Sequence, residues 1–208
     1  MRWWQTKVRL GVYGAGLALV GTTVAPLSAV QTLAAQQASL TAEQARSDFQ
    51  RMARNGGYWV ASNDRYATEE SGEPDEYRMA FELTPDGYSI VGCMWGSVGF
   101  ERSEPFWYLM HAWDPTTETV LAYQSSPSGA IAIGRERPAE GGGRESIQTL
   151  RWTDGSTERV RHLNRPIDGN TLESRSFGSP DAGEGSWEPR RSYTWVWRPS
   201  EEVSPCSA

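Results

Sequence analysis

The chain of 208 residues contains only two histidines, His111 and His162, and their imidazoles are the groups best suited to acid–base or ligand chemistry. Both lie in segments with a period of two, so His111 shares a face with Trp107 and Trp113. His162 shares a face with Val160 in the same way. If these faces line the inside of a curved sheet, each imidazole could serve as a ligand or a general base. The alternative is that both are hydrogen-bonded within a packed wall.

Other catalytic signatures are missing from the sequence. No His-x-His or His-Glu-x-x-His spacing is present, so we predict no metal site. Ser128 lacks the Gly-x-Ser-x-Gly frame of a nucleophile elbow, and the glycines at 141–143 lack the Gly-Lys-Ser/Thr of a phosphate loop. Lys7 is the only lysine and lies near the N-terminus, which excludes Schiff-base chemistry from a processed chain. We therefore assign no catalytic residue and expect no cofactor.

Arginines on strands give a second kind of candidate. Arg135, Arg151 and Arg175 fall among residues that could face a barrel interior, where a guanidinium can hold a ligand carboxylate. The alternative is that they point outward and keep the strands soluble. The residues that we expect to contact a ligand are Trp95, Trp107, His111, Trp113, Tyr123, Arg135, His162 and Trp195.

The stretch 106–129 organises the elements that must position these residues. It reads as two aromatic-rich strands joined by a turn over 114–117, with Pro115 where its fixed φ suits the first central turn position. Both faces of the first strand are apolar, with Tyr108 and Met110 opposite the face of His111. A strand of this kind is expected to be covered on both faces, one by the barrel interior and the other by a helix or loop.

The rest of the chain from residue 57 to 198 repeats the hairpin pattern. Pro85-Asp86-Gly87 and Asp154-Gly155 are strong signals for tight turns between alternating runs. About nine or ten short strands follow one another with turn signals every 8–12 residues. This meander predicts an all-β fold, a single closed antiparallel up-and-down barrel.

One helix is expected before the barrel, within residues 36–56. Thr41 suits the N-cap, Gln44 completes a capping box, and Phe49 and Met52 fall near one face. The helix could be a lid or plug of the barrel, or it could lie on the barrel wall. Residues 199–208 are expected to form a flexible tail.

Residues 1–35 read as a signal peptide. Arg2, Lys7 and Arg9 precede an uncharged apolar run over 10–27, and small residues at 29–35 suit cleavage. A membrane anchor is the alternative, disfavoured by the glycines in the run. We expect a secreted or periplasmic protein with no stable membrane insertion after cleavage.

The net charge limits the classes of possible partner, and the two cysteines allow a disulfide. The first 35 residues hold three of the 20 basic and none of the 26 acidic residues, so the remainder carries 17 against 26, a net charge of −9. This balance argues against nucleic acid or an anionic membrane as the main partner. Cys93 and Cys206 could form a disulfide after export, or remain a buried thiol and a loose terminal one.

The order of motifs resembles that of bacterial exported families of unknown function with calycin (lipocalin-like) barrels. The motifs concerned are Gly-Tyr-Trp at 57–59, the Pro-Asp-Gly hairpin, Met-Trp-Gly at 94–96, Trp-Asp at 113–114, Ser-Gly at 128–129, Trp-Thr-Asp-Gly at 152–155 and a Trp-rich last strand. The resemblance implies an internal cavity, similar to that of fatty-acid-binding proteins and nitrobindin-like barrels. A nitrobindin-like haem site would require a histidine on the last strand, and residues 193–198 contain none, so haem is not expected.

Three classes of function remain open. The aromatic-rich wall and the lack of catalytic motifs favour an exported barrel that binds a small apolar or aromatic molecule. A cofactor-free barrel enzyme, an isomerase or hydrolase, would need a buried polar cluster around His111 or His162. A structural or interaction protein would need a barrel filled by side chains and an exposed apolar patch. The sequence does not indicate an oligomeric state.

Overall fold

The computed structural model describes residues 39–54, 56–98, 101–179, 186–200 and 206. The predicted leader and most of the predicted C-terminal tail lie outside these residues. Among the described residues, no helix is both long and apolar enough to cross a membrane.

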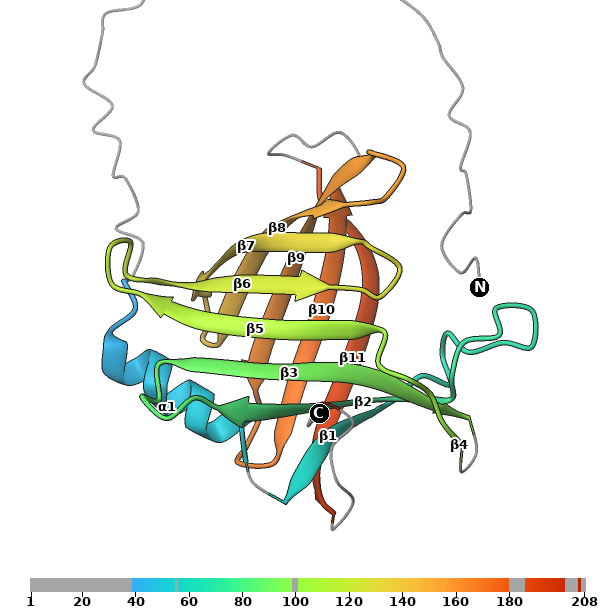
Figure 1. Cartoon of the computed structure of the whole chain (residues 1–208), viewed down its shortest axis with the longest axis horizontal. Coiled ribbons are helices and arrows are strands. Elements are labelled where there is room, and N and C mark those ends of the chain that lie inside the picture. Colours follow the sequence, from blue (N-terminus) through green and yellow to red (C-terminus); the bar gives the residue numbers. More distant parts are fainter. Residues whose placement is uncertain (1–38, 55, 99–100, 180–185, 201–205, 207–208) are drawn as a thin grey trace, which may run out of the picture. The chain divides into compact units, whose positions relative to one another are not determined.

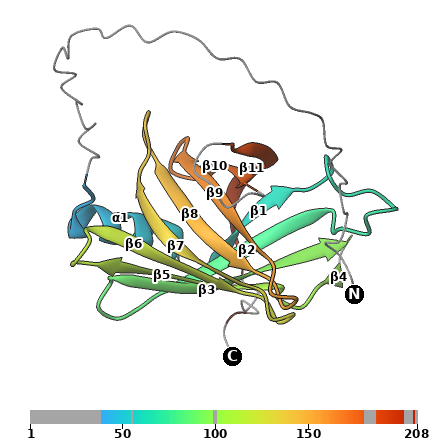
Figure 2. The same ribbon diagram turned by 90° about the horizontal axis from the view of Figure 1, so that it is seen from above.

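Ten antiparallel strands close into an up-and-down barrel, as predicted (Figures 1 and 2). Each strand pairs with its neighbours in the chain, and β1 and β11 pair with each other to complete the ring. Strands β5 and β6 lie on the opposite side of the ring from β10 and β11. The strands of the ring are β1 Gly57–Ser62, β2 Glu76–Leu83, β3 Ser89–Val98, β5 Trp107–Asp114, β6 Thr119–Ser125, β7 Ile131–Pro138, β8 Arg144–Arg151, β9 Thr157–Pro166, β10 Thr171–Ser179 and β11 Glu188–Pro199. The short β4, Glu101–Arg102, pairs with β3 outside the ring.

Side chains alternate between the interior and the outer face of the ring. On β5, Leu109 is buried in the core and His111 lies near it inside the barrel. The outward Tyr108 is 46% exposed, so the described residues do not give the outer face of β5 the cover that its apolar sequence predicted. The outer faces of the neighbouring strands are apolar as well, and together with β5 they form one exposed apolar surface. Among the described residues, this surface is not covered by a second layer of structure.

Helix α1, Ala42–Met52, is the expected helix and lies at one end of the barrel, the lid position among the alternatives that the sequence left open (Figure 1). The predicted capping box is present, with the Thr41 hydroxyl accepting from the Gln44 backbone N–H at 3.2 Å and the Gln44 side chain accepting from the Thr41 N–H at 2.9 Å. The buried Phe49 belongs to the same core as the inward residues of β2 and β3. The Trp59 indole donates to the Met52 carbonyl at 3.1 Å and fixes the end of the helix over β1.

The opposite end of the barrel is filled by a polar and aromatic network around the loop between β1 and β2. The Glu73 carboxylate accepts hydrogen bonds from Asn63, Tyr77 and both terminal nitrogens of Arg191 at 2.8–3.1 Å. Tyr193 donates to the Asn63 side-chain oxygen at 3.0 Å. Burial alone would raise the pKa of Glu73, but the hydrogen bonds and charge of Arg191 outweigh it and lower the pKa. This network closes its end of the barrel with paired groups.

A disulfide joins Cys93 on β3 to Cys206 and holds Cys206 at the outer face of the barrel. It settles the alternatives that the sequence left open for the two cysteines. Trp95, two residues along β3, lies on the same outer face and is 1% exposed, packed with Tyr58 and Ala80. The disulfide closes a loop of over 100 residues, which stabilises the folded barrel by constraining the unfolded chain.

Candidate functional site

The barrel encloses a cavity of about 570 Å³ that lies beneath α1. Its volume is within the range of pockets that hold small organic molecules. One side is apolar and is formed by the helix and by strands on both sides of β1, with Phe49, Met52, Met79, Phe81, Ile90, Met94, Leu109, Leu172 and Trp195. The other side is polar and is formed mainly by β6 to β10, with Gln124, Glu136, Arg144, Ser146, Gln148, His162, Asn164 and Ser174.

The sheet register brings three polar side chains together on the polar wall. Glu136 on β7 pairs directly with Ser146 on β8, and Ser146 pairs with His162 on β9. Directly paired residues on neighbouring antiparallel strands have Cβ atoms about 5 Å apart, so the three side chains form one short row. Gly134, two residues before Glu136, permits the close approach of β8, because a Cβ there would lie 1.9 Å from the Ile147 carbonyl oxygen.

His111 extends this row from β5 by an ion pair with Glu136, with 3.1 Å between Nδ1 and Oε1. Burial opposes the positive charge of His111, but the adjoining carboxylate outweighs burial and raises the pKa of the imidazole. Burial likewise opposes the negative charge of Glu136, and His111 outweighs it and lowers the pKa of the carboxyl group. The two residues therefore form a buried pair of opposite charges.

His162 differs from His111 although the two share one cavity. Burial lowers the pKa of His162 to about 4, and the nearby Glu136 only partly opposes this effect. The imidazole is therefore neutral at pH 7, with one ring nitrogen that donates and one that accepts a hydrogen bond. Within the part of the chain that the structure describes, neither nitrogen has a hydrogen-bond partner. His162 thus offers both a donor and an acceptor to the cavity.

A chain of amides runs beside the histidines. Gln124 on β6 donates to the Gln148 side-chain oxygen at 3.1 Å, and Gln148 donates to the Ser146 hydroxyl oxygen at 2.8 Å. The Ser146 hydroxyl accepts in this bond, so its hydrogen remains available to a group in the cavity. The chain fixes Ser146 and Gln148, which are both almost fully buried, in the middle of the polar wall.

The mouth of the cavity lies between α1 and the turn that joins β7 to β8. Asp48 on the helix pairs with Arg144 at the start of β8, with 2.8 Å between Arg144 Nε and Asp48 Oδ2. Arg51 binds the other oxygen of Asp48 at 2.9 Å. On the far side, Arg54 binds Asn170 at 2.6 Å. These polar contacts hold the lid at its rim, whereas apolar packing holds it over β2, β3 and β5.

The structure separates the predicted ligand-contact residues into two groups. Trp107, His111, Trp113, His162 and Trp195 point to the inside of the barrel, and of these His111, His162 and Trp195 line the cavity. Trp107 and Trp113 pack against the core at its two ends. The Trp195 indole donates to the Ser174 hydroxyl at 2.9 Å, so it is oriented within the wall.

Trp95, Tyr123 and Arg135 lie on the outer face and do not line the cavity. Arg135 binds Asp114 at 2.7 Å and is about half exposed, which is the outward alternative that we left open for strand arginines. Its orientation follows from strand parity, because the adjacent Glu136 points inward. Tyr123 points outward because it pairs with the outward Met110.

Sequence reasoning missed Glu136, Gln124, Ser146 and Gln148. On β7 the misleading signal was Ile133, which is apolar but 46% exposed on the outer face. Small residues with one polar side chain form the inner face of this strand, the reverse of the usual apolar-in pattern. His111 is inward on β5, and inward and outward residues alternate along each strand. Following this alternation through the hairpin turns from β5 to β7 could have identified the inner face of β7.

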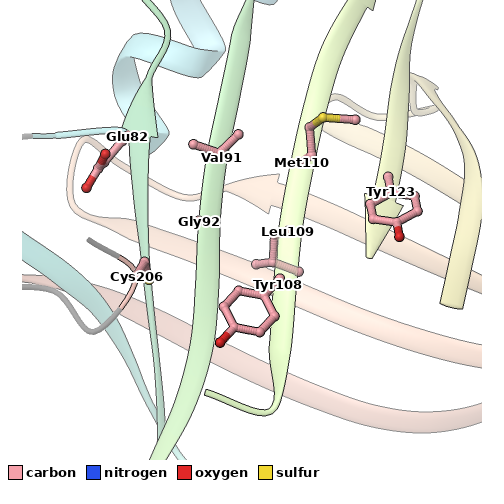
Figure 3. Close-up of a pocket in the computed structure, with 8 residues that line it drawn as sticks. All are labelled: Glu82, Val91, Gly92, Tyr108, Leu109, Met110, Tyr123 and Cys206. Carbon is pink, nitrogen blue, oxygen red and sulfur yellow. The ribbon is translucent and has the colours of Figure 1, made fainter. Parts of the chain in front are cut away.

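A second hollow lies on the outer surface, beside the disulfide (Figure 3). It measures about 330 Å³ and is bordered by Val91, Met110 and Tyr123 on neighbouring strands β3, β5 and β6. Tyr108 and Cys206 complete one side of it. Charged groups are scarce here, and the hollow lacks the row of polar groups that distinguishes the lumen.

No protein-family model matches the chain, and no curated protein matches it significantly in sequence. The described residues contain no group of three or more histidine, cysteine, aspartate and glutamate side chains that could hold a metal ion. The closed ten-stranded antiparallel barrel is consistent with a calycin-like fold.

Proposed function

We propose that this protein is an exported barrel that binds a small amphipathic molecule in its lumen. The observation that carries the proposal is the cavity of about 570 Å³, whose apolar wall faces a row of polar groups. A packed structural barrel would fill this space with side chains, since protein interiors leave few voids larger than a water molecule. The apolar wall would hold a hydrocarbon or aromatic body, and the polar wall would orient its head group.

Export is part of the proposal. The Cys93–Cys206 disulfide supports it, because disulfides persist mainly in oxidising compartments. The basic and apolar leader over residues 1–35 supports it independently. On the motifs given above, we propose that the protein is a bacterial exported calycin-like barrel that is secreted or periplasmic.

The test is a titration of the mature protein with aromatic and long-chain amphipathic probes, followed by tryptophan fluorescence. We expect a saturable change, because the indole of Trp195 lines the cavity. Val120→Phe narrows the lumen, and Ile133→Phe adds the same ring on the outer face. The first variant should weaken binding at least tenfold, and the second should leave it unchanged. Equal effects of the two variants, or no saturable signal with any probe, would refute lumenal binding.

A second candidate function is proton transfer by a cofactor-free enzyme, an isomerase or hydrolase. The observation in its favour is that His111 and His162 face one cavity with their pKa values displaced in opposite directions. Such a pair supplies a protonated acid and a neutral base at the same pH. Incubation of a carbonyl-containing ligand in deuterated water should then give deuterium in the ligand with the native protein and none with His162→Leu. Absence of exchange with every bound ligand would leave binding as the function.

A further inference from the structure

We infer that the lumen selects a ligand whose buried head group is an uncharged hydroxyl, as in an alcohol or phenol, rather than a carboxylate or an ammonium group. The inference rests on the proposed function and specifies the ligand class of the same site. It depends on three features of the polar wall, namely its balance of charge, its unused hydrogen-bonding capacity and the spacing of its side chains.

Within the row formed by His111, Glu136, Ser146 and His162, the charges cancel. Glu136 is paired with His111 at 3.1 Å, and His162 is neutral at pH 7. A carboxylate placed in this row is attracted by His111 but repelled by Glu136. An ammonium group is attracted by Glu136 but repelled by His111. Either ion would also lose its hydration on entering the barrel, which is costly unless a dedicated partner replaces the water.

The mouth is the competing site for an anion that lies nearest to the polar row, because Arg144 lines the cavity there. Arg51 and Arg144 share the single carboxylate of Asp48, which leaves one positive charge in excess. Both guanidiniums are already ion-paired with Asp48; the side chain of Arg51 is 33% exposed and that of Arg144 is 15% exposed. A carboxylate there would gain little, because it would compete with Asp48 for both arginines and would be repelled by it. The inner row, where buried polar groups keep unused hydrogen-bonding capacity, has more to gain from a ligand.

The unused groups include both an acceptor and a donor, the two kinds of partner that a hydroxyl needs. The free nitrogen of His162 and the second oxygen of Glu136 accept hydrogen bonds, and the Ser146 hydroxyl donates one because it already accepts from Gln148. A hydroxyl donates one hydrogen bond and accepts another, so it can satisfy an acceptor and a donor together. An ether or a ketone only accepts, and a hydrocarbon does neither.

The register places these groups within reach of one oxygen atom. Ser146 stands between Glu136 and His162 on adjacent strands, with Cβ separations of about 5 Å on each side. A hydroxyl oxygen above Ser146 is therefore close to both acceptors. Met79 on β2 lies across the ring from Ser146 on β8, and the apolar lining residues on that side would receive the remainder of the molecule.

The test uses five naphthalenes that differ only in the group at position 2: hydroxyl, methoxy, methyl, carboxylate and aminomethyl. Binding to the disulfide-intact mature protein is measured at pH 7 by isothermal titration calorimetry. We expect 2-naphthol to bind about tenfold more tightly than the methoxy and methyl compounds, which corresponds to one additional net hydrogen bond. The two charged compounds should bind more weakly still.

His162→Leu should remove the advantage of 2-naphthol and leave 2-methylnaphthalene unchanged, while His162→Gln, which keeps a donor and an acceptor, should retain part of it. Circular dichroism confirms that each variant is folded. If naphthoate equals or exceeds naphthol in the native protein, the head-group inference is wrong although the lumen still binds ligands. The same holds if all five compounds bind alike. If none binds, the proposed function fails and this inference fails with it.

Discussion

The barrel contains two polar clusters of similar size, and they differ in how completely their hydrogen bonds are formed. At the loop end, the Glu73 carboxylate is held by Arg191, Asn63 and Tyr77, and Tyr193 is held by Asn63. In the lumen, the His111–Glu136 pair and the amide chain are satisfied only in part. His162 has no hydrogen bond to any residue that the structure describes.

This difference separates structure from function within one barrel. Buried polar groups in native proteins are normally paired, because an unpaired group loses its hydration without compensation. The network around Glu73 follows this rule and closes one end of the barrel. His162 instead faces a cavity of about 570 Å³ without a hydrogen bond to a described residue, so its ring nitrogens are available to a molecule in the lumen. The contrast leads to different expectations for equivalent substitutions in the two clusters.

The largest effect is expected from Glu73→Ala. It leaves Arg191, Asn63 and Tyr77 without their shared acceptor, and breaking such a buried pair should lower the free energy of unfolding by about 4 kcal/mol. Urea unfolding followed by circular dichroism measures the loss. Glu173→Ala, which removes a more exposed pair with Arg175, should cost less than about 1 kcal/mol. Similar losses for the two variants would show that the network is not a structural closure.

The next effect concerns His162 and pH. Its pKa of about 4 in the folded protein lies below the ordinary value of 6.5, so between these values the unfolded chain takes up a proton that the folded chain does not. Stability should therefore fall as pH drops from 6.5, by about 3 kcal/mol at pH 4. His162→Leu lacks this contribution and should lose correspondingly less over the same range. Parallel pH profiles of unfolding for the two proteins would contradict the burial of a neutral imidazole.

His111 should affect the pH dependence of stability above pH 6.5. Its pKa is raised in the folded protein, so its contribution is complete below pH 6.5 and is lost as the pH rises through the folded value. His111→Gln removes the charge and should flatten the alkaline limb of the stability profile, measured by thermal unfolding. A variant that is less stable by the same amount at every pH would indicate a purely steric role for His111.

The smallest effect is expected from Tyr77→Phe. It removes one hydroxyl from the network around Glu73, where the Tyr77 to Glu73 distance is 3.1 Å, and should cost about 1 kcal/mol. Probe binding in the lumen should not change. Ser146→Ala is the corresponding change in the lumen, and it should weaken the binding of 2-naphthol more than it affects unfolding. If Tyr77→Phe weakened probe binding, or if Ser146→Ala affected unfolding more than the binding of 2-naphthol, the two clusters would not differ in role.

The sequence predicted the fold because its signals are local. Turn chemistry at Asp86-Gly87 and Asp154-Gly155, alternation along the strands and the capping box at Thr41 each act within a few residues. The alternation along β5 also grouped His111 with Trp107 and Trp113 on one face, which is the inward face in the structure. These features do not depend on distant parts of the chain.

The site was harder to predict because it depends on which face of each strand is inward. On β7 the apolar Ile133 lies outside and Glu136 inside, which no hydrophobicity rule anticipates. Pairing of Glu136 with His111 joins β7 to β5 across the intervening β6, so it becomes visible only when the register is known. The orientation of Arg135 and the cover over Trp95 depend in the same way on tertiary structure.

The most direct test of lumenal binding is a methyl NMR titration with ¹³C-labelled methionine. Met52, Met79 and Met94 line the cavity, whereas Met110 borders the hollow on the outer face (Figure 3). Addition of 2-naphthol should shift the methyl resonances of the three lumenal methionines saturably and leave that of Met110 in place. A saturable shift of Met110 alone would place the ligand on the outer surface and contradict the account.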